Sequence, residues 1–109
     1  MVDVKHYSYR VIWSEEDREF VGLCAEFPNL SHLDEDQVSA LTGILALVTD
    51  VVSEMETTSE TPPVPMAHRH YSGTLQVHTT PELHRRLALH AAEANVSLNR
   101  VVNDQLAKS

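Results

Sequence analysis

A short stretch near the C-terminal end of the chain alternates strictly between apolar and polar residues. From residue 74 to residue 79, one set of alternate positions holds Leu75, Val77 and Thr79, and the other set holds Thr74, Gln76 and His78. A period of two is typical of a β-strand with one buried and one exposed face. The stretch therefore predicts a strand whose exposed face carries only hydrogen-bonding side chains.

Two short helices are predicted after this strand. Pro81 suits the first turn of a helix, and apolar residues then recur at helical spacing at positions 83, 87, 91 and 94. Asn95 suits the C-cap of this helix, and Ser97 suits the N-cap of the next one. The second helix would bury Leu98, Val101, Val102 and Leu106.

A segment of one strand and two helices needs a second copy of itself. A lone strand leaves its backbone N–H and C=O groups unpaired, and two short helices bury too little apolar surface. In a homodimer, the two strands pair antiparallel and four helices enclose a shared core. We expect this core to contain Leu75, Val77, Leu83, Leu87, Leu98, Val101 and Val102.

The exposed face of such a two-stranded ribbon predicts contacts to DNA. Each chain would present Thr74, Gln76 and His78 to base edges, since a ribbon fits the major groove and Gln can bond adenine in bidentate fashion. Two places would contact phosphates. One is Arg69, and the other is the start of the second helix, Ser97-Leu98-Asn99, where backbone N–H groups are free. The alternative is a dimerisation module whose polar strand face is only solvated.

Residues 1–56 predict a small α+β domain. Alternation over 7–14 and 19–27 predicts a β-hairpin closed by a charged loop, and residues 31–33 predict a short third strand. Asp34-Glu35-Asp36 would cap a long apolar helix that must lie on the sheet or on a partner. Gly22 and Gly43 suggest close approach of the backbone, or a bulge at Gly22.

The remaining segments complete the expected organisation. Residues 57–70 contain Thr, Ser and Pro in place of an apolar pattern, which predicts a stiff, partly extended linker. Residues 71–109 form the dimerising, DNA-binding domain described above. The single Cys24 lies in an apolar strand pattern and indicates a buried thiol in a reducing compartment. Because no apolar run approaches the length of a membrane span, we expect a cytoplasmic protein.

Charge divides the chain into two parts. The formal net charge of the 109 residues is −8, which disfavours nucleic acid as a partner of the whole surface. Residues 1–65 have 13 acidic and 3 basic residues, a net charge of −10, whereas residues 66–109 have 3 acidic and 5 basic residues, a net charge of +2. This asymmetry predicts two modules. The C-terminal module would bind phosphate, and the acidic N-terminal module would bind a basic partner.

The C-terminal segment resembles the ribbon-helix-helix family of Arc-like repressors. The resemblance rests on the alternating strand, on Pro81-Glu82-Leu83 and on Val96-Ser97-Leu98-Asn99. Tyr71-Ser72-Gly73 and the run Glu82-Leu83-His84-Arg85-Arg86-Leu87 look like the C-terminal part of HicB-type antitoxins. The order of the N-terminal elements is similar to the N-terminal domain of those antitoxins, a partial ribonuclease-H-like fold.

The resemblance implies an antitoxin that represses its own operon. It would bind operator DNA as a dimer, or as a tetramer if both modules self-associate, and its acidic domain would cover a HicA-like RNA-cleaving toxin. The sequence departs from the family at Thr74 and His78, since strands of this type usually carry a basic residue at one of these places. The change lowers the attraction to phosphate. A stand-alone transcriptional regulator without a toxin is the nearest alternative.

An enzymatic function has little support in the sequence. A ribonuclease-H-like nuclease, active or degenerate, would need several carboxylates that converge on two metal ions, but the strands carry only Glu19 and Glu26 and the acids at 34–36 diverge. His68-Arg69-His70 lacks the ligand spacing of a structural zinc site and suits a flexible basic arm better. We therefore expect no catalytic residues, no cofactor and no metal site.

Overall fold

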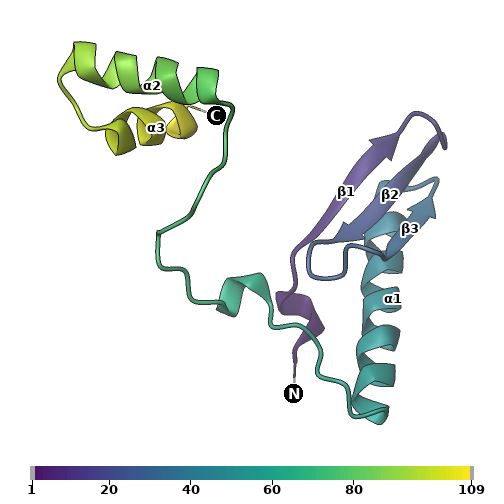
Figure 1. Ribbon diagram of the computed structural model, residues 1–109. Helices are drawn as coiled ribbons and strands as arrows, with labels where there is room; N and C mark the ends of the chain where they lie inside the picture. The colour runs from purple at the N-terminus through teal and green to yellow at the C-terminus, as the bar shows by residue number, and fades with distance from the viewer. Residues whose placement is uncertain (1, 109) are drawn as a thin grey trace. The chain divides into compact units, whose positions relative to one another are not determined.

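The computed structural model describes residues 2–108, which form two compact units, one that ends at Tyr71 and one that begins at Ser72. In chain order the first unit contains the 3-10 turn η1 (Val4–His6), strands β1 (Tyr9–Ser14), β2 (Glu19–Cys24) and β3 (Ser31–Asp34), helix α1 (Gln37–Thr57) and the 3-10 turn η2 (Met66–His68). The second contains helices α2 (Pro81–Ala94) and α3 (Leu98–Ala107) (Figure 1). The expected α+β class is confirmed.

The first unit is built on an antiparallel sheet with the order β1-β2-β3. The charged loop between β1 and β2 forms the expected hairpin turn, in which Arg18 takes a φ of 56°. Asp36 caps α1 as expected, because its carboxylate accepts a hydrogen bond from the Ser39 N–H at 2.9 Å. The helix runs to Thr57 and so includes the first residue of the expected linker.

Helix α1 covers one face of the sheet, as Figure 1 shows. Its buried residues are Ala40, Ile44, Val48 and Val52. Gly22 lies directly under the helix, where an added Cβ would collide with the carbonyl oxygen of Ala40 and lie 2.9 Å from Ile44 Cγ2. An added Cβ at Gly43 would collide with the His32 ring. Close approach is therefore confirmed at both glycines, and the regular β1–β2 register shows no bulge at Gly22.

The opposite face of the sheet has no covering layer among residues 2–71 of the first unit. Strand register places Ile12 beside Val21 and Val21 beside Leu33, on the side away from Gly22 and α1. Ile12 and Leu33 are 44% and 41% exposed. We call this apolar row, together with Leu23, the open face.

Helix α1 has 21 residues and is apolar enough that, by length and composition alone, it could cross a membrane. The expectation that no apolar run is long enough for a span is therefore wrong. The helix nevertheless buries one side against the sheet, through Ile44 and Val48 among others. Core helices of soluble domains have the same length and composition.

The segment that follows α1 lies on the first unit. The Tyr7 hydroxyl donates a hydrogen bond to the carbonyl oxygen of Pro63 at 2.8 Å, and the Met66 N–H donates one to Glu26 Oε2 at 2.9 Å. We call residues 58–71 the strap. The expected linker, 57–70, thus belongs to the first unit, because buried polar groups of the sheet domain hold its backbone.

Candidate nucleic-acid interface

The stretch expected to read DNA, Thr74–Thr79, pairs with no other strand within residues 2–108. All six side chains are exposed, those of Gln76 and His78 included. A strand needs a neighbour to satisfy its backbone N–H and C=O groups. Within one chain of this protein, the stretch therefore stays irregular.

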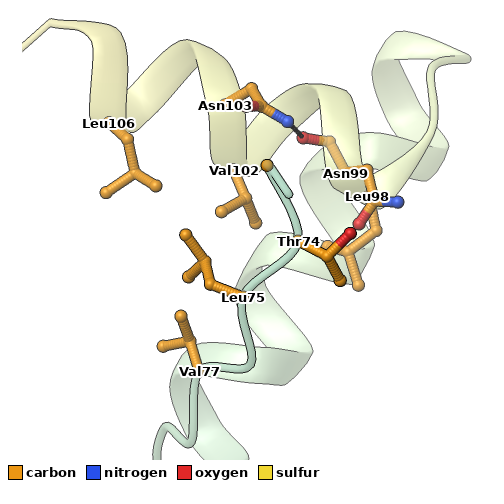
Figure 2. Close-up of a pocket in the computed structure, with 9 residues that line it drawn as sticks. Thr74, Leu75, Val77, Leu98, Asn99, Val102, Asn103 and Leu106 are labelled. Carbon is orange, nitrogen blue, oxygen red and sulfur yellow. Dashed lines mark hydrogen bonds between the residues drawn. The ribbon is translucent and has the colours of Figure 1, made fainter. Parts of the chain in front are cut away.

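The apolar residues of this stretch lie beside α3. They contribute to an open groove of about 410 Å³ whose apolar lining comes from Leu75, Val77, Leu98, Val102 and Leu106. Figure 2 shows these side chains around an open space, with the chain at Leu75 and Val77 on one side and α3 on the other. Thr74, expected on the polar face, also lines this groove, together with Asn99 and Asn103. Gln76 and His78 are not part of its lining.

Local capping fixes the two helices of the second unit. The Thr80 hydroxyl accepts a hydrogen bond from the Leu83 N–H at 3.2 Å, and Pro81 occupies the first turn of α2. Asn95 ends α2 in the left-handed conformation, with a φ of 56°. Ser97 then starts α3 by accepting from the Arg100 N–H at 3.1 Å. The predicted caps at Asn95 and Ser97 are confirmed.

The residues expected to contact phosphates fall into two groups. Ser97, Leu98 and Asn99 form the start of α3, where Ser97 and Asn99 are exposed and Leu98 is half-buried against the groove. Arg69 belongs instead to the strap of the first unit, and its Nε donates a hydrogen bond to the Val64 carbonyl oxygen at 3.0 Å. The guanidinium is thus tied to the strap rather than carried on a free arm.

The residues expected in a dimer core are only partly covered by their own chain. Val101 in α3 is buried, as is Ala91 in α2, and the two helices contact each other. Leu87, Leu98 and Val102 are half-buried. The most exposed members of the set are Leu75 at 73%, Val77 at 60% and Leu83 at 39%.

The sequence pattern did not single out the polar cluster under the strap. Glu26 is 9% exposed, and its carboxylate accepts hydrogen bonds from the Ser8 N–H and hydroxyl and from the Met66 N–H. Burial acts to raise the pKa of Glu26, but these donors stabilise the carboxylate and hold the pKa below its ordinary value. The strap also carries His68, whose Nε2 atom lies 3.0 Å from the Nδ1 atom of His6. The sequence gives only one sign of the strap. Glu26 is an acid at the end of a predicted strand, and a Pro-rich segment comes later in the chain.

Titratable residues elsewhere give no sign of a catalytic centre. Among residues 2–108, no group of three or more His, Cys, Asp or Glu side chains is placed to hold a metal ion. Cys24 is a buried free thiol, as expected, and burial raises its pKa. A high pKa keeps the sulfur protonated and unreactive.

Comparison with known proteins adds one match. Residues 57–106, which include most of the strap and both helices of the second unit, match the family model of the HicB family. No curated protein and no solved structure matches the chain. The C-terminal part of this chain is thus similar to the HicB family, which supports the HicB-type antitoxin that the sequence motifs suggested.

Proposed function

We propose that the protein is an antitoxin of a toxin–antitoxin pair and represses its own operon. In this proposal, the second unit dimerises as a ribbon-helix-helix domain and binds operator DNA. The first unit binds a small basic toxin that cleaves RNA, similar to HicA. The observation that carries the proposal is the HicB match over a unit whose Thr74–Thr79 stretch lacks a partner strand within the described residues.

Dimerisation through this stretch is supported by exposed apolar surface. Leu75, Val77 and Leu106 are each more than half exposed, although they line a common groove. Burying an apolar side chain of this size contributes about 1.5–3 kcal/mol. A second copy that adds its own strand would cover these side chains and satisfy the backbone groups of both strands at once.

Operator binding by the dimer is supported by the polar row and by charge. Gln76 and His78 do not line the groove, so both are free to face outward when Leu75 and Val77 turn inward. The net charge of +2 on residues 66–109 suits a phosphate backbone better than the acidic first unit does. Gln76 is the strongest candidate for a base contact.

The toxin would bind to the open face of the first unit. Ile12, Val21 and Leu33 form an apolar row across all three strands. Glu19 lies next to this row on the same face, two residues before Val21, and the hairpin acids 15–17 follow β1. An apolar centre with an acidic border suits a partner whose own contact surface is apolar at its centre and cationic at its rim.

The decisive experiment uses the full-length protein with DNA from its own promoter and with the product of a small basic reading frame adjacent to its gene. We expect salt-dependent DNA binding in a titration, and a complex with the adjacent product in sedimentation. Ile12→Asp should lower toxin affinity at least tenfold and leave DNA binding unchanged. Val38→Asp, which changes a residue of α1 that is 70% exposed, is the matched control. Failure to bind promoter DNA at low salt would refute the repressor part.

The two alternatives make different predictions. A stand-alone regulator binds its promoter in the same titration but forms no complex with a neighbouring gene product. A ribonuclease-H-like nuclease requires metal-dependent cleavage of RNA by the purified protein. The latter has no support in the described residues, because Glu26 is engaged by three hydrogen-bond donors under the strap and no carboxylate cluster is present there.

A further inference from the structure

Two histidines that are 62 residues apart in sequence meet at one end of the first unit. His6 ends η1 and His68 ends η2, and the Nδ1 atom of His6 lies 3.0 Å from the Nε2 atom of His68. The rings are edge to face, with centroids 4.9 Å apart. At this distance one nitrogen must donate a hydrogen and the other must offer its lone pair. Two ligating atoms of the kind that transition metals prefer therefore face each other.

A carboxylate lies on the far side of the His6 ring. Asp3 Oδ2 is 3.5 Å from His6 Nε2, and Asp3 Oδ1 accepts a hydrogen bond from the Lys5 N–H at 2.9 Å. The carboxylate favours the tautomer of His6 that carries its proton on Nε2. The lone pair of His6 is then on Nδ1, which faces His68. Metal-binding histidines commonly have such a carboxylate behind the ring.

The site is also open and held in place by other contacts. A cavity of about 270 Å³ adjoins the pair and is lined by Val2, Asp3, His6, Val64, Pro65 and His68. This volume accommodates an ion and several water ligands. The strap that carries His68 is fixed independently, by the hydrogen bonds of Tyr7 to Pro63 and of Met66 to Glu26. The two rings therefore do not depend on each other to stay close.

We propose that His6 and His68 bind a divalent transition-metal ion such as Zn²⁺ or Ni²⁺, with Asp3 orienting His6. Zn–N bonds of about 2.0–2.1 Å at a tetrahedral angle separate two nitrogens by roughly 3.3 Å. The nitrogens therefore need to part by only a few tenths of an ångström, and the rings have to tilt so that both lone pairs point to the ion. On binding, the proton of His68 moves through solvent from Nε2 to Nδ1, and the ion accepts both lone pairs. Water fills the remaining positions.

Two protein ligands make a weaker site than the four of a structural zinc site. The ion would therefore be exchangeable and the site filled only when the metal is plentiful. A bound ion would join the beginning of the chain to the strap, immediately before the second unit. The proposal is independent of the antitoxin function, because it rests on contacts within the first unit alone.

Titration of the metal-free, full-length protein with ZnCl₂ in a calorimeter tests the proposal. We expect one ion per chain, and at least a tenfold loss of affinity in both His6→Asn and His68→Asn. Asp3→Asn keeps a side chain able to cap η1 and should weaken binding about tenfold. His84→Asn, an exposed histidine of the second unit, is the control and should bind as the wild type does.

A second measurement separates ligation from a loss of folding. In nitrogen-resolved NMR spectra of the imidazoles, Zn²⁺ should shift His6 Nδ1 and His68 Nε2 in the wild-type protein. Circular dichroism of each variant without metal checks that the fold is intact. Zn²⁺ affinity that is unchanged in both histidine variants, or shifts confined to the other histidines, would overturn the proposal.

Discussion

The carboxylate of Glu26, in the turn after β2, accepts a hydrogen bond from the backbone N–H of Met66, 40 residues later in the chain, at 2.9 Å. The same carboxylate accepts two bonds from Ser8, and the Cys24 Sγ lies 3.6 Å from its Oε1 atom. One buried acid thus holds the strap on the sheet domain. A buried carboxylate without these donors would be costly.

Glu26→Gln should destabilise the first unit by about 1–3 kcal/mol, because an amide cannot accept bonds at both ends and leaves at least one buried donor unsatisfied. Chemical denaturation monitored by the fluorescence of Trp13 measures the change. Glu16→Gln, in the exposed hairpin loop, is the control and should unfold like the wild type. Equal stability of Glu26→Gln and wild type would contradict the role of Glu26 as the anchor of the strap.

The same acid predicts how stability depends on pH. The pKa of Glu26 is lower in the folded than in the unfolded protein, so the unfolded state binds more protons in acid. The stabilisation is complete above the ordinary Glu pKa, roughly 4.3, and is lost as the pH falls through the lower folded pKa. Denaturation at a series of pH values should therefore show the difference between wild type and Glu26→Gln shrinking below about pH 4.3.

Gly22→Ala should destabilise the sheet domain by about 1–3 kcal/mol through overpacking. The added methyl group would meet the Ala40 carbonyl, and that backbone atom cannot turn aside as a side chain could. Gly73→Ala is a useful contrast, since an added Cβ there has no neighbour within 4 Å and costs only the strain of a φ of 84°. A thermal melt that is unchanged in Gly22→Ala would mean that α1 lies farther from β2.

Leu87→Asp should dissociate the dimer proposed for the second unit, because Leu87 is half-buried on the side of α2 that also carries Ala91. An unpaired charge in a shared core costs several kcal/mol. Sedimentation of the full-length variant gives the oligomeric state. Ala92→Asp places the same charge on an exposed position of α2 and should leave the dimer intact. A dimer that survives Leu87→Asp would show that this helix face is not at the interface.

Gln76→Ala should weaken the proposed binding to the cognate operator by about 1–3 kcal/mol and leave the proposed dimer unchanged. The side chain is exposed and does not line the apolar groove, so its loss should not affect folding. Fluorescence anisotropy with operator DNA at a stated salt concentration measures the change. Gln105→Ala in α3 serves as the control. Operator affinity that stays at the wild-type level would remove Gln76 from the base-reading surface.

Much of the local structure follows from patterns in the sequence. Alternation predicts β1 and β2, and it also predicts a strand over 74–79, which finds no strand partner among residues 2–108. Helical spacing predicts the three helices, and the capping residues Asp36, Asn95 and Ser97 lie where the chain changes direction. These features depend on neighbours only a few residues away. The extent of β2 is overestimated, since Phe27 donates its N–H to the Cys24 carbonyl in a turn rather than to a strand.

These patterns do not predict contacts between residues that are far apart in the sequence. Alternation defines two faces of the sheet but does not say which one receives α1, and it is the face with Gly22 and Cys24 rather than the one with Val21 and Leu23. The sequence predicts a linker over 57–70, because no local pattern shows that Glu26 binds the backbone of this segment. Contact between His6 and His68 likewise depends on the folded strap.

If the protein is a repressor as proposed, the missing strand partner of Thr74–Thr79 has a consequence for the control of gene expression. Because the stretch finds no strand partner among residues 2–108 of its own chain, a base-reading ribbon would come into being only when two molecules meet. At low abundance, occupancy of a promoter would then rise with the square of the number of molecules per cell. When growth dilutes such a repressor, the occupancy of its promoter would fall nearly to zero. As synthesis restores the concentration, the occupancy would rise steeply.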